Sequence, residues 1–129
     1  MDTNDRRRHL DSITDRIIAC AYTVANTLGH GFLEKVYENA LAREIRKVGL
    51  QVQQQCPLKV YYDGVIVGDY AADLLVEGSV IVELKAVRAV DDVQTAQCLN
   101  YLKAARLSVC LLINFGKPKI DVRRIVSNF

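Results

Sequence analysis

The sequence lacks closely spaced cysteines and long apolar runs. Its four cysteines stand far apart with no CxxC pair and no histidine at ligand spacing, which argues against a zinc site and a disulfide framework. We therefore expect buried free thiols in a reducing compartment. No apolar run approaches the roughly 20 residues that cross a bilayer, so we expect a cytoplasmic protein that is neither exported nor inserted in a membrane.

The sequence also has little net charge and no glycine-rich phosphate loop. A net charge of +2 permits contact with nucleic acid but does not by itself indicate it. The missing phosphate loop weakens the case for a small-molecule phosphohydrolase. At 129 residues, half of them hydrophobic and a quarter charged, the chain has the composition of one globular domain. We expect a single domain over residues 1–129, with residues 1–11 as a flexible N-terminal segment.

Apolar spacing predicts two leading helices. The first is expected from Ser12 to Leu28, where Ser12 and Asp15 resemble a capping box. The second begins after Gly29-His30-Gly31 and stops at Gly49. A third helix is expected after the Asp91-Asp92 cap and ends near Ala105.

Alternating and β-branched residues predict the strands. Turn signals at Asp63-Gly64 and Glu77-Gly78 indicate two consecutive hairpins in the middle of the chain. The expected strands are 52–62, 65–67, 69–76, 80–85, the continuously apolar 109–113, and a partly exposed last strand within 120–126. This order predicts an α/β (α+β) fold in which one mixed sheet is flanked by helices.

The segment from Asp73 to Lys85 places charged side chains inside apolar strands. Buried carboxylates are usually paired or bound to a metal, because an unpaired charge in a low dielectric costs several kcal/mol. Glu83 and Lys85 lie two residues apart in a strand and therefore point to the same face. The position of Asp73 depends on the length of the turn at Glu77-Gly78.

A two-residue loop would put Asp73 opposite Val82, on the wrong face of the sheet. A three-residue loop of 76–78, with Gly78 in the left-handed conformation, would pair Leu75 with Ser79. Asp73 would then face Ile81 and lie diagonal to Glu83, roughly 7 to 8 Å away between α-carbons. We predict the three-residue loop, with a bulge near Glu83 as another route to the same arrangement.

Two carboxylates beside a lysine suit Mg²⁺ or Mn²⁺, which prefer oxygen ligands and keep several waters. Such a cation lowers the pKa of a bound water, and Lys85 would orient that water or stabilise the transition state. The alternative is a structural ion pair between Glu83 and Lys85 on an exposed strand face, with Asp73 unrelated to it. The pattern D-x9-E-x-K alone does not decide between them.

Two further groups of residues accompany this segment. Glu34 and Tyr37 share one face of the second helix, and Gln97 and Tyr101 lie one turn apart in the third. Each also has an ordinary explanation, such as a helix-dipole acid, a surface amide or a core aromatic.

Together these motifs resemble a known family. Gly31, Glu34 and Tyr37 match the motif of the GxxExxY proteins, while the acid, ExK and QxxxY elements of the PD-(D/E)XK nuclease superfamily match Asp73, Glu83, Lys85, Gln97 and Tyr101. The resemblance runs from about Ile13 to Val126. Ala72 stands where the superfamily name has proline, which leaves the metal ligand intact.

The resemblance implies a restriction-endonuclease-like core and a metal site. It makes Asp73, Glu83 and Glu34 the metal-binding acids and Lys85 the catalytic lysine, and it places Gln97 and Tyr101 on the substrate side. The implied function is metal-dependent hydrolysis of nucleic acid, with DNA favoured over RNA, and by analogy a homodimer. A non-catalytic nucleic-acid-binding or regulatory module that keeps the fold remains the alternative.

His30 and a basic C-terminal cluster have less specific interpretations. His30 could face the cleft, although a loop histidine is more often solvated. The C-terminal basic residues could meet phosphates or simply guard an edge strand: Lys117, Lys119, Arg123 and Arg124.

Overall fold

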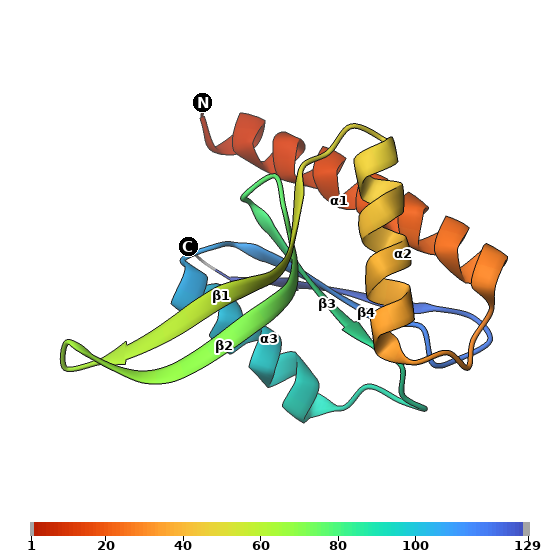
Figure 1. Cartoon of the computed structure of the whole chain (residues 1–129). Coiled ribbons are helices and arrows are strands. Elements are labelled where there is room, and N and C mark those ends of the chain that lie inside the picture. Colours follow the sequence, from red (N-terminus) through yellow and green to blue (C-terminus); the bar gives the residue numbers. More distant parts are fainter. Residues whose placement is uncertain (1, 128–129) are drawn as a thin grey trace.

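The computed structural model describes residues 2–127 and contains one mixed five-stranded sheet between two layers of helices (Figure 1). The strand order is β1-β2-β3-β4-β5, and only β3 and β4 are parallel. The elements are α1 (Thr3–Leu28), α2 (Glu34–Lys47), β1 (Val52–Tyr62), β2 (Val65–Val76), β3 (Val80–Lys85), α3 (Asp92–Ala105), β4 (Val109–Asn114) and β5 (Asp121–Val126). The predicted mixed sheet flanked by helices is confirmed.

The core lies on both faces of the central strands β3 and β4. On one face, α1 and α2 pack against side chains such as Val82 and Leu84. On the other face, α3 packs against Ile81 and Leu112. Burial on both faces explains why β4 reads as one apolar run, as predicted. It also puts the α3 face of β3, which carries Glu83, inside the protein.

The first helix begins earlier than expected. α1 starts at Thr3, and the Asp2 side chain caps it by accepting a hydrogen bond of 2.8 Å from the backbone N–H of Asp5. Ser12 therefore lies inside the helix, and the predicted start there is wrong. The added turns are rich in arginine and solvated, so they carry no apolar periodicity that could have revealed them. Met1, part of the segment expected to be flexible, lies outside the described residues.

The antiparallel meander has three strands where we expected four. β2 runs without a break through Gly68, and the pairing with β1 shifts between Val60 and Tyr61. Gly68 therefore lies within one strand, and the predicted division into strands 65–67 and 69–76 is wrong. A Cβ on Gly68 would lie 2.8 Å from the ring of Tyr70, so the glycine makes room for that ring.

The remaining elements follow the prediction. α3 has a full capping box made by Asp91 and Gln94, and β5 is an edge strand. Three of the four cysteines are buried and Cys56 is half-buried, and all four are free thiols. None of the helices described here is both long and apolar enough to cross a membrane.

Candidate active site

The register between β2 and β3 brings Asp73 to Glu83. Leu74 pairs with Val82 and Val76 with Val80, so the loop is formed by residues 77–79. The predicted pairing of Leu75 with Ser79 is wrong by two residues, because Val76 still belongs to the ladder and its carbonyl accepts from the Ser79 N–H. The predicted loop length and the positive φ of Gly78 (61°) are confirmed. Asp73 therefore lies beside Glu83, where we had expected it beside Ile81.

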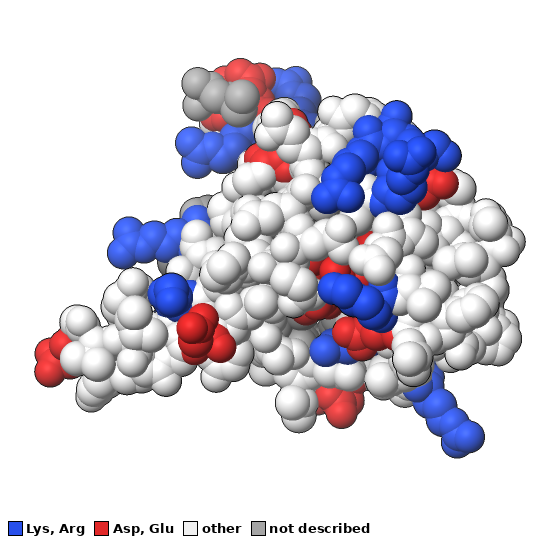
Figure 2. Space-filling model, viewed as in Figure 1, with Lys and Arg blue, Asp and Glu red and all other residues white. Residues whose placement is uncertain are grey.

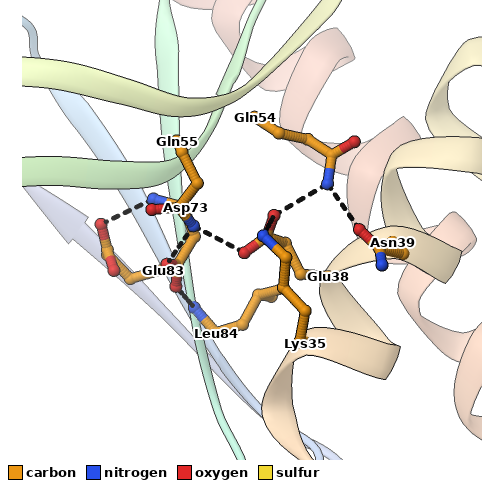
Figure 3. Close-up of polar contacts among 8 residues, drawn as sticks. All are labelled: Lys35, Glu38, Asn39, Gln54, Gln55, Asp73, Glu83 and Leu84. Carbon is orange, nitrogen blue, oxygen red and sulfur yellow. Dashed lines mark hydrogen bonds and ion pairs between the residues drawn. The ribbon is translucent and has the colours of Figure 1, made fainter.

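The two acids are joined by reciprocal contacts beyond the end of the regular ladder (Figure 3). The backbone N–H of Asp73 donates to Glu83 Oε1 at 3.2 Å, and the backbone N–H of Leu84 donates to Asp73 Oδ2 at 2.8 Å. Each carboxylate thus accepts from the backbone of the neighbouring strand. These contacts fix both side chains on rigid elements of the sheet.

Glu83 carries a proton at neutral pH that a bound cation could replace. Glu83 is only 4 % exposed, and burial, followed by the charge of Asp73 and a side-chain hydrogen bond to it, raises the pKa of Glu83 to about 9. At neutral pH Glu83 therefore keeps its proton, because a second negative charge beside Asp73 in this buried position is unfavourable. A divalent cation satisfies the same pair without that restriction, so this donor set fits Mg²⁺ or Mn²⁺.

Lys85 and Glu34 lie within electrostatic reach of this pair. The pKa of Glu34 is raised, first by burial and then by the charge of Asp73, and the Lys85 ammonium partly lowers it. Among residues 2–127 no group of three or more His, Cys, Asp or Glu side chains is arranged to hold a metal ion. Two acids therefore form the centre, and a role for Glu34 as a third ligand remains a prediction.

Helix α3 closes the site from the other side. Gln97 Nε2 donates to the Tyr101 hydroxyl at 3.1 Å, as their spacing predicted. Burial raises the pKa of Tyr101, and the charges of Glu83 and Asp73 raise it further. The phenol of Tyr101 therefore lies close to both acids, and its ring centroid is 5.8 Å from that of Tyr70.

A second polar group, which was not predicted from the sequence, lies next to the acids and has Glu38 as its central acceptor. Glu38 is 4 % exposed and accepts from Lys35 Nζ at 2.9 Å, Gln54 Nε2 at 2.8 Å and Gln55 Nε2 at 2.7 Å. Burial raises the pKa of Glu38, but these hydrogen bonds and the Lys35 charge outweigh it, so the pKa lies below its usual value. Glu38 is thus a fixed anion.

Gln55 connects this anion to the site. Its Nε2 lies 2.7 Å from Glu38 and 3.3 Å from Asp73 Oδ1, and Figure 3 shows it between the two carboxylates. Its backbone φ is 52°, a left-handed conformation that is unusual for a non-glycine residue inside a strand. The one signal in the sequence was Glu38 itself, an acid between Tyr37 and Leu41 on the apolar face of α2.

Tyr37 supports the loop that carries Glu34. Its hydroxyl donates to the Gly29 carbonyl at 2.7 Å and accepts from the Phe32 N–H at 3.2 Å. Its ring stacks on Phe115 with centroids 4.7 Å apart. Tyr37 is therefore a structural residue, and its position fixes the start of α2, whose first residue is Glu34.

The other predicted groups lie elsewhere. His30 is exposed in the loop before α2. Within the basic C-terminal cluster, Arg123 pairs with Asp121 at 3.5 Å and Arg124 with Asp11 at 2.6 Å. Two of the four basic residues therefore have acidic partners at the protein surface.

Comparisons with known proteins agree with this fold. No curated protein sequence matches the chain. A solved structure, that of SSO0001, is similar in fold, with a TM-score of 0.56 and 16 % sequence identity over 96 % of this chain and 62 % of that one. This chain thus spans less than two thirds of that protein. The family model of the PD-(D/E)XK nuclease superfamily matches residues 11–125, and the chain therefore belongs to this superfamily.

Proposed function

We propose that this chain hydrolyses phosphodiester bonds of nucleic acid, DNA in preference to RNA, with Mg²⁺ or Mn²⁺ as its cation. The observation that carries the proposal is the contact between Asp73 and buried Glu83, with Lys85 on the same strand. A buried carboxyl group whose pKa is strongly raised beside a second acid is costly to maintain and is common at functional sites. Membership of a nuclease superfamily supports nucleic acid as the substrate class.

Each residue has a role in this proposal. Asp73 and Glu83 would hold the cation, which supplies a water ligand of lowered pKa and neutralises charge on the phosphate. The Lys85 ammonium would orient the attacking water and stabilise negative charge on the phosphoryl oxygens. Glu34 would complete or tune the ligand shell of the cation. Tyr101 and Gln97 would donate hydrogen bonds to the substrate.

We also propose membership of the GxxExxY family. What supports it is that the three motif residues have related roles. Gly31 has a φ of 112°, which favours glycine, Tyr37 holds the loop before α2, and the charge of Asp73 contributes to the raised pKa of Glu34 at the start of that helix. The motif thus describes one structural unit that presents an acid to the site.

The cellular setting is proposed on more general grounds. Free buried thiols suit the reducing cytoplasm. We further propose that residues 1–129 act as a single domain, and that two copies assemble as a homodimer, so that two sites can reach both strands of a duplex.

The experiment measures cleavage of labelled single-stranded DNA, duplex DNA and RNA by the purified full chain. Wild type should cut in Mg²⁺ or Mn²⁺ and lose activity in chelator. Lys85→Met should lower the rate by about 100-fold or more, because it removes a charge beside the developing phosphate charge. Lys103→Met is the matched control, since Lys103 is exposed near the end of α3.

The outcomes are distinct. If Lys85→Met cuts as fast as wild type, the assigned roles are wrong. If wild type binds nucleic acid but cuts none of the three substrates in either metal, the non-catalytic binding module replaces the nuclease.

A further inference from the structure

Strands β1 and β2 project beyond the helices as a two-stranded arm, defined here as residues 57–71 (Figure 1). Seven of the fifteen exposed large hydrophobic side chains of the described chain lie on this arm. They are Val60, Tyr61, Tyr62, Val65, Ile66, Val67 and Tyr70, each between 37 % and 75 % exposed. Apolar residues concentrated on one projecting segment need a different explanation from apolar residues scattered singly over a surface.

The exposed apolar area approaches that of a stable interface. At about 200 Å² for a whole tyrosine side chain, the three arm tyrosines alone expose roughly 370 Å². With the four aliphatic residues, the exposed apolar area summed over both faces of the arm exceeds the roughly 300 to 600 Å² of the largest patch on a typical monomer. The total comes close to the roughly 800 Å² that each partner contributes to a standard interface.

The charge of the arm does not fit nucleic acid. Its charged residues are Lys59, Asp63 and Asp69, and Lys59 lies 3.6 Å from Asp69. The remaining charge, that of Asp63 at the tip, is negative, whereas a surface for phosphates needs positive charge. Figure 2 shows the arm as largely uncharged. The partner is therefore expected to offer an apolar surface.

Side-chain packing suits this arm better than addition of another strand. β1 is the edge of the sheet and contains Pro57, which lacks a backbone donor and blunts strand addition. Beside the arm, a cavity of about 450 Å³ opens between β1 and the end of α3. Its apolar lining includes Cys56, Leu58, Tyr61, Ala104, Ala105 and Leu107.

We propose that two copies of this chain associate through the arm, each arm packing against the partner's arm and into the cavity at its base. A two-fold interface uses the same patch on both subunits, so the patch must contain a projection and a matching hollow. The arm supplies the projection, and the cavity at its base supplies the hollow. The inference rests on the proposed homodimer and is independent of cleavage, because assembly is measured as mass.

The test is analytical ultracentrifugation of the full chain at micromolar concentration. Wild type should sediment at twice the monomer mass of 14.5 kDa. Tyr62→Asp should raise the dimer dissociation constant by about 100-fold or more, because it buries an unpaired charge at the interface. Tyr62 is 75 % exposed, so the variant should fold, which circular dichroism checks.

The matched control is Val93→Asp, which places the same charge at a site equally exposed (75 %) but on α3. It should remain a dimer. A monomeric wild type overturns the inference. If Tyr62→Asp then also weakens DNA binding, the arm contacts nucleic acid and not a second copy. A dimer that survives in Tyr62→Asp with unchanged affinity also overturns it and shows that the copies meet elsewhere. Neither result bears on the cleavage assay.

Discussion

The raised pKa of Glu83 beside Asp73 predicts how the free energy of unfolding depends on pH when no metal is added. The pKa of Glu83 is about 9 in the folded protein and 4.5 for an ordinary glutamate. Between these values the folded state binds a proton that the unfolded state has released, so raising the pH favours unfolding. One proton corresponds to a loss of at most about 1.4 kcal/mol of unfolding free energy per pH unit.

The perturbation is Glu83→Gln, which keeps the shape and the hydrogen-bonding atoms but cannot release the proton. From pH 6 to pH 8, wild type in chelator should lose up to about 3 kcal/mol, or roughly 10 °C in melting temperature. Glu83→Gln should lose little of either over that range. Asp69→Asn, at a side chain that is 68 % exposed, is the control and should follow wild type.

The assay is urea unfolding followed by circular dichroism at a series of pH values. A wild-type free energy of unfolding that is constant or rises from pH 6 to pH 8 would refute the raised pKa of Glu83. So would a Glu83→Gln variant that loses stability as steeply as wild type.

Three further predictions follow from other contacts. Gln55→Ala should weaken Mg²⁺ binding by about 10-fold to 100-fold in calorimetry, because it removes the link between Glu38 and Asp73. The control is Gln54→Ala, which should bind nearly as wild type because Gln54 contacts Glu38 and Asn39 but not Asp73. Equal losses of Mg²⁺ affinity in the two variants would contradict the assignment. Tyr37→Phe should cost about 1 to 3 kcal/mol of unfolding free energy by leaving two loop groups without a partner, and an unchanged urea midpoint would show that the hydroxyl is not needed. Mg²⁺ binding should release up to about one proton near neutral pH and tighten as the pH rises, and calorimetric heats that do not depend on the buffer would exclude this.

Most of the architecture could be predicted because it depends on local patterns. The apolar period of α2, the capping residues at Asp91 and Gln94 and the buried run of β4 each act over a few residues. The beginning of α1 depended on a cap at Asp2 followed by solvated arginines, which leave no periodic signal. The continuity of β2 through Gly68 depends on its pairing with β1, a contact between strands that a single glycine does not reveal.

The candidate site was predicted only in part for a similar reason. Alternation within one strand indicated that Glu83 and Lys85 share a face, and the predicted three-residue loop brought Asp73 to the same face. The exact partner of Asp73 depended on the backbone conformation of Glu77, whose φ is 53° although glutamate does not favour this region. Glu38 and Gln55 come from different elements and meet only through the packing of α2 on β1. Such long-range contacts leave no periodic pattern in one sequence.

The most direct test of the metal centre is X-ray diffraction from crystals of the full chain soaked in Mn²⁺, with anomalous scattering to locate the ion. The account predicts a peak between the carboxylates of Asp73 and Glu83, with Mn–O distances of about 2.0 to 2.3 Å, and loss of that peak in Asp73→Asn crystals. Well-diffracting wild-type crystals with no peak at this pair, at a concentration of Mn²⁺ that loads other nucleases, would contradict it.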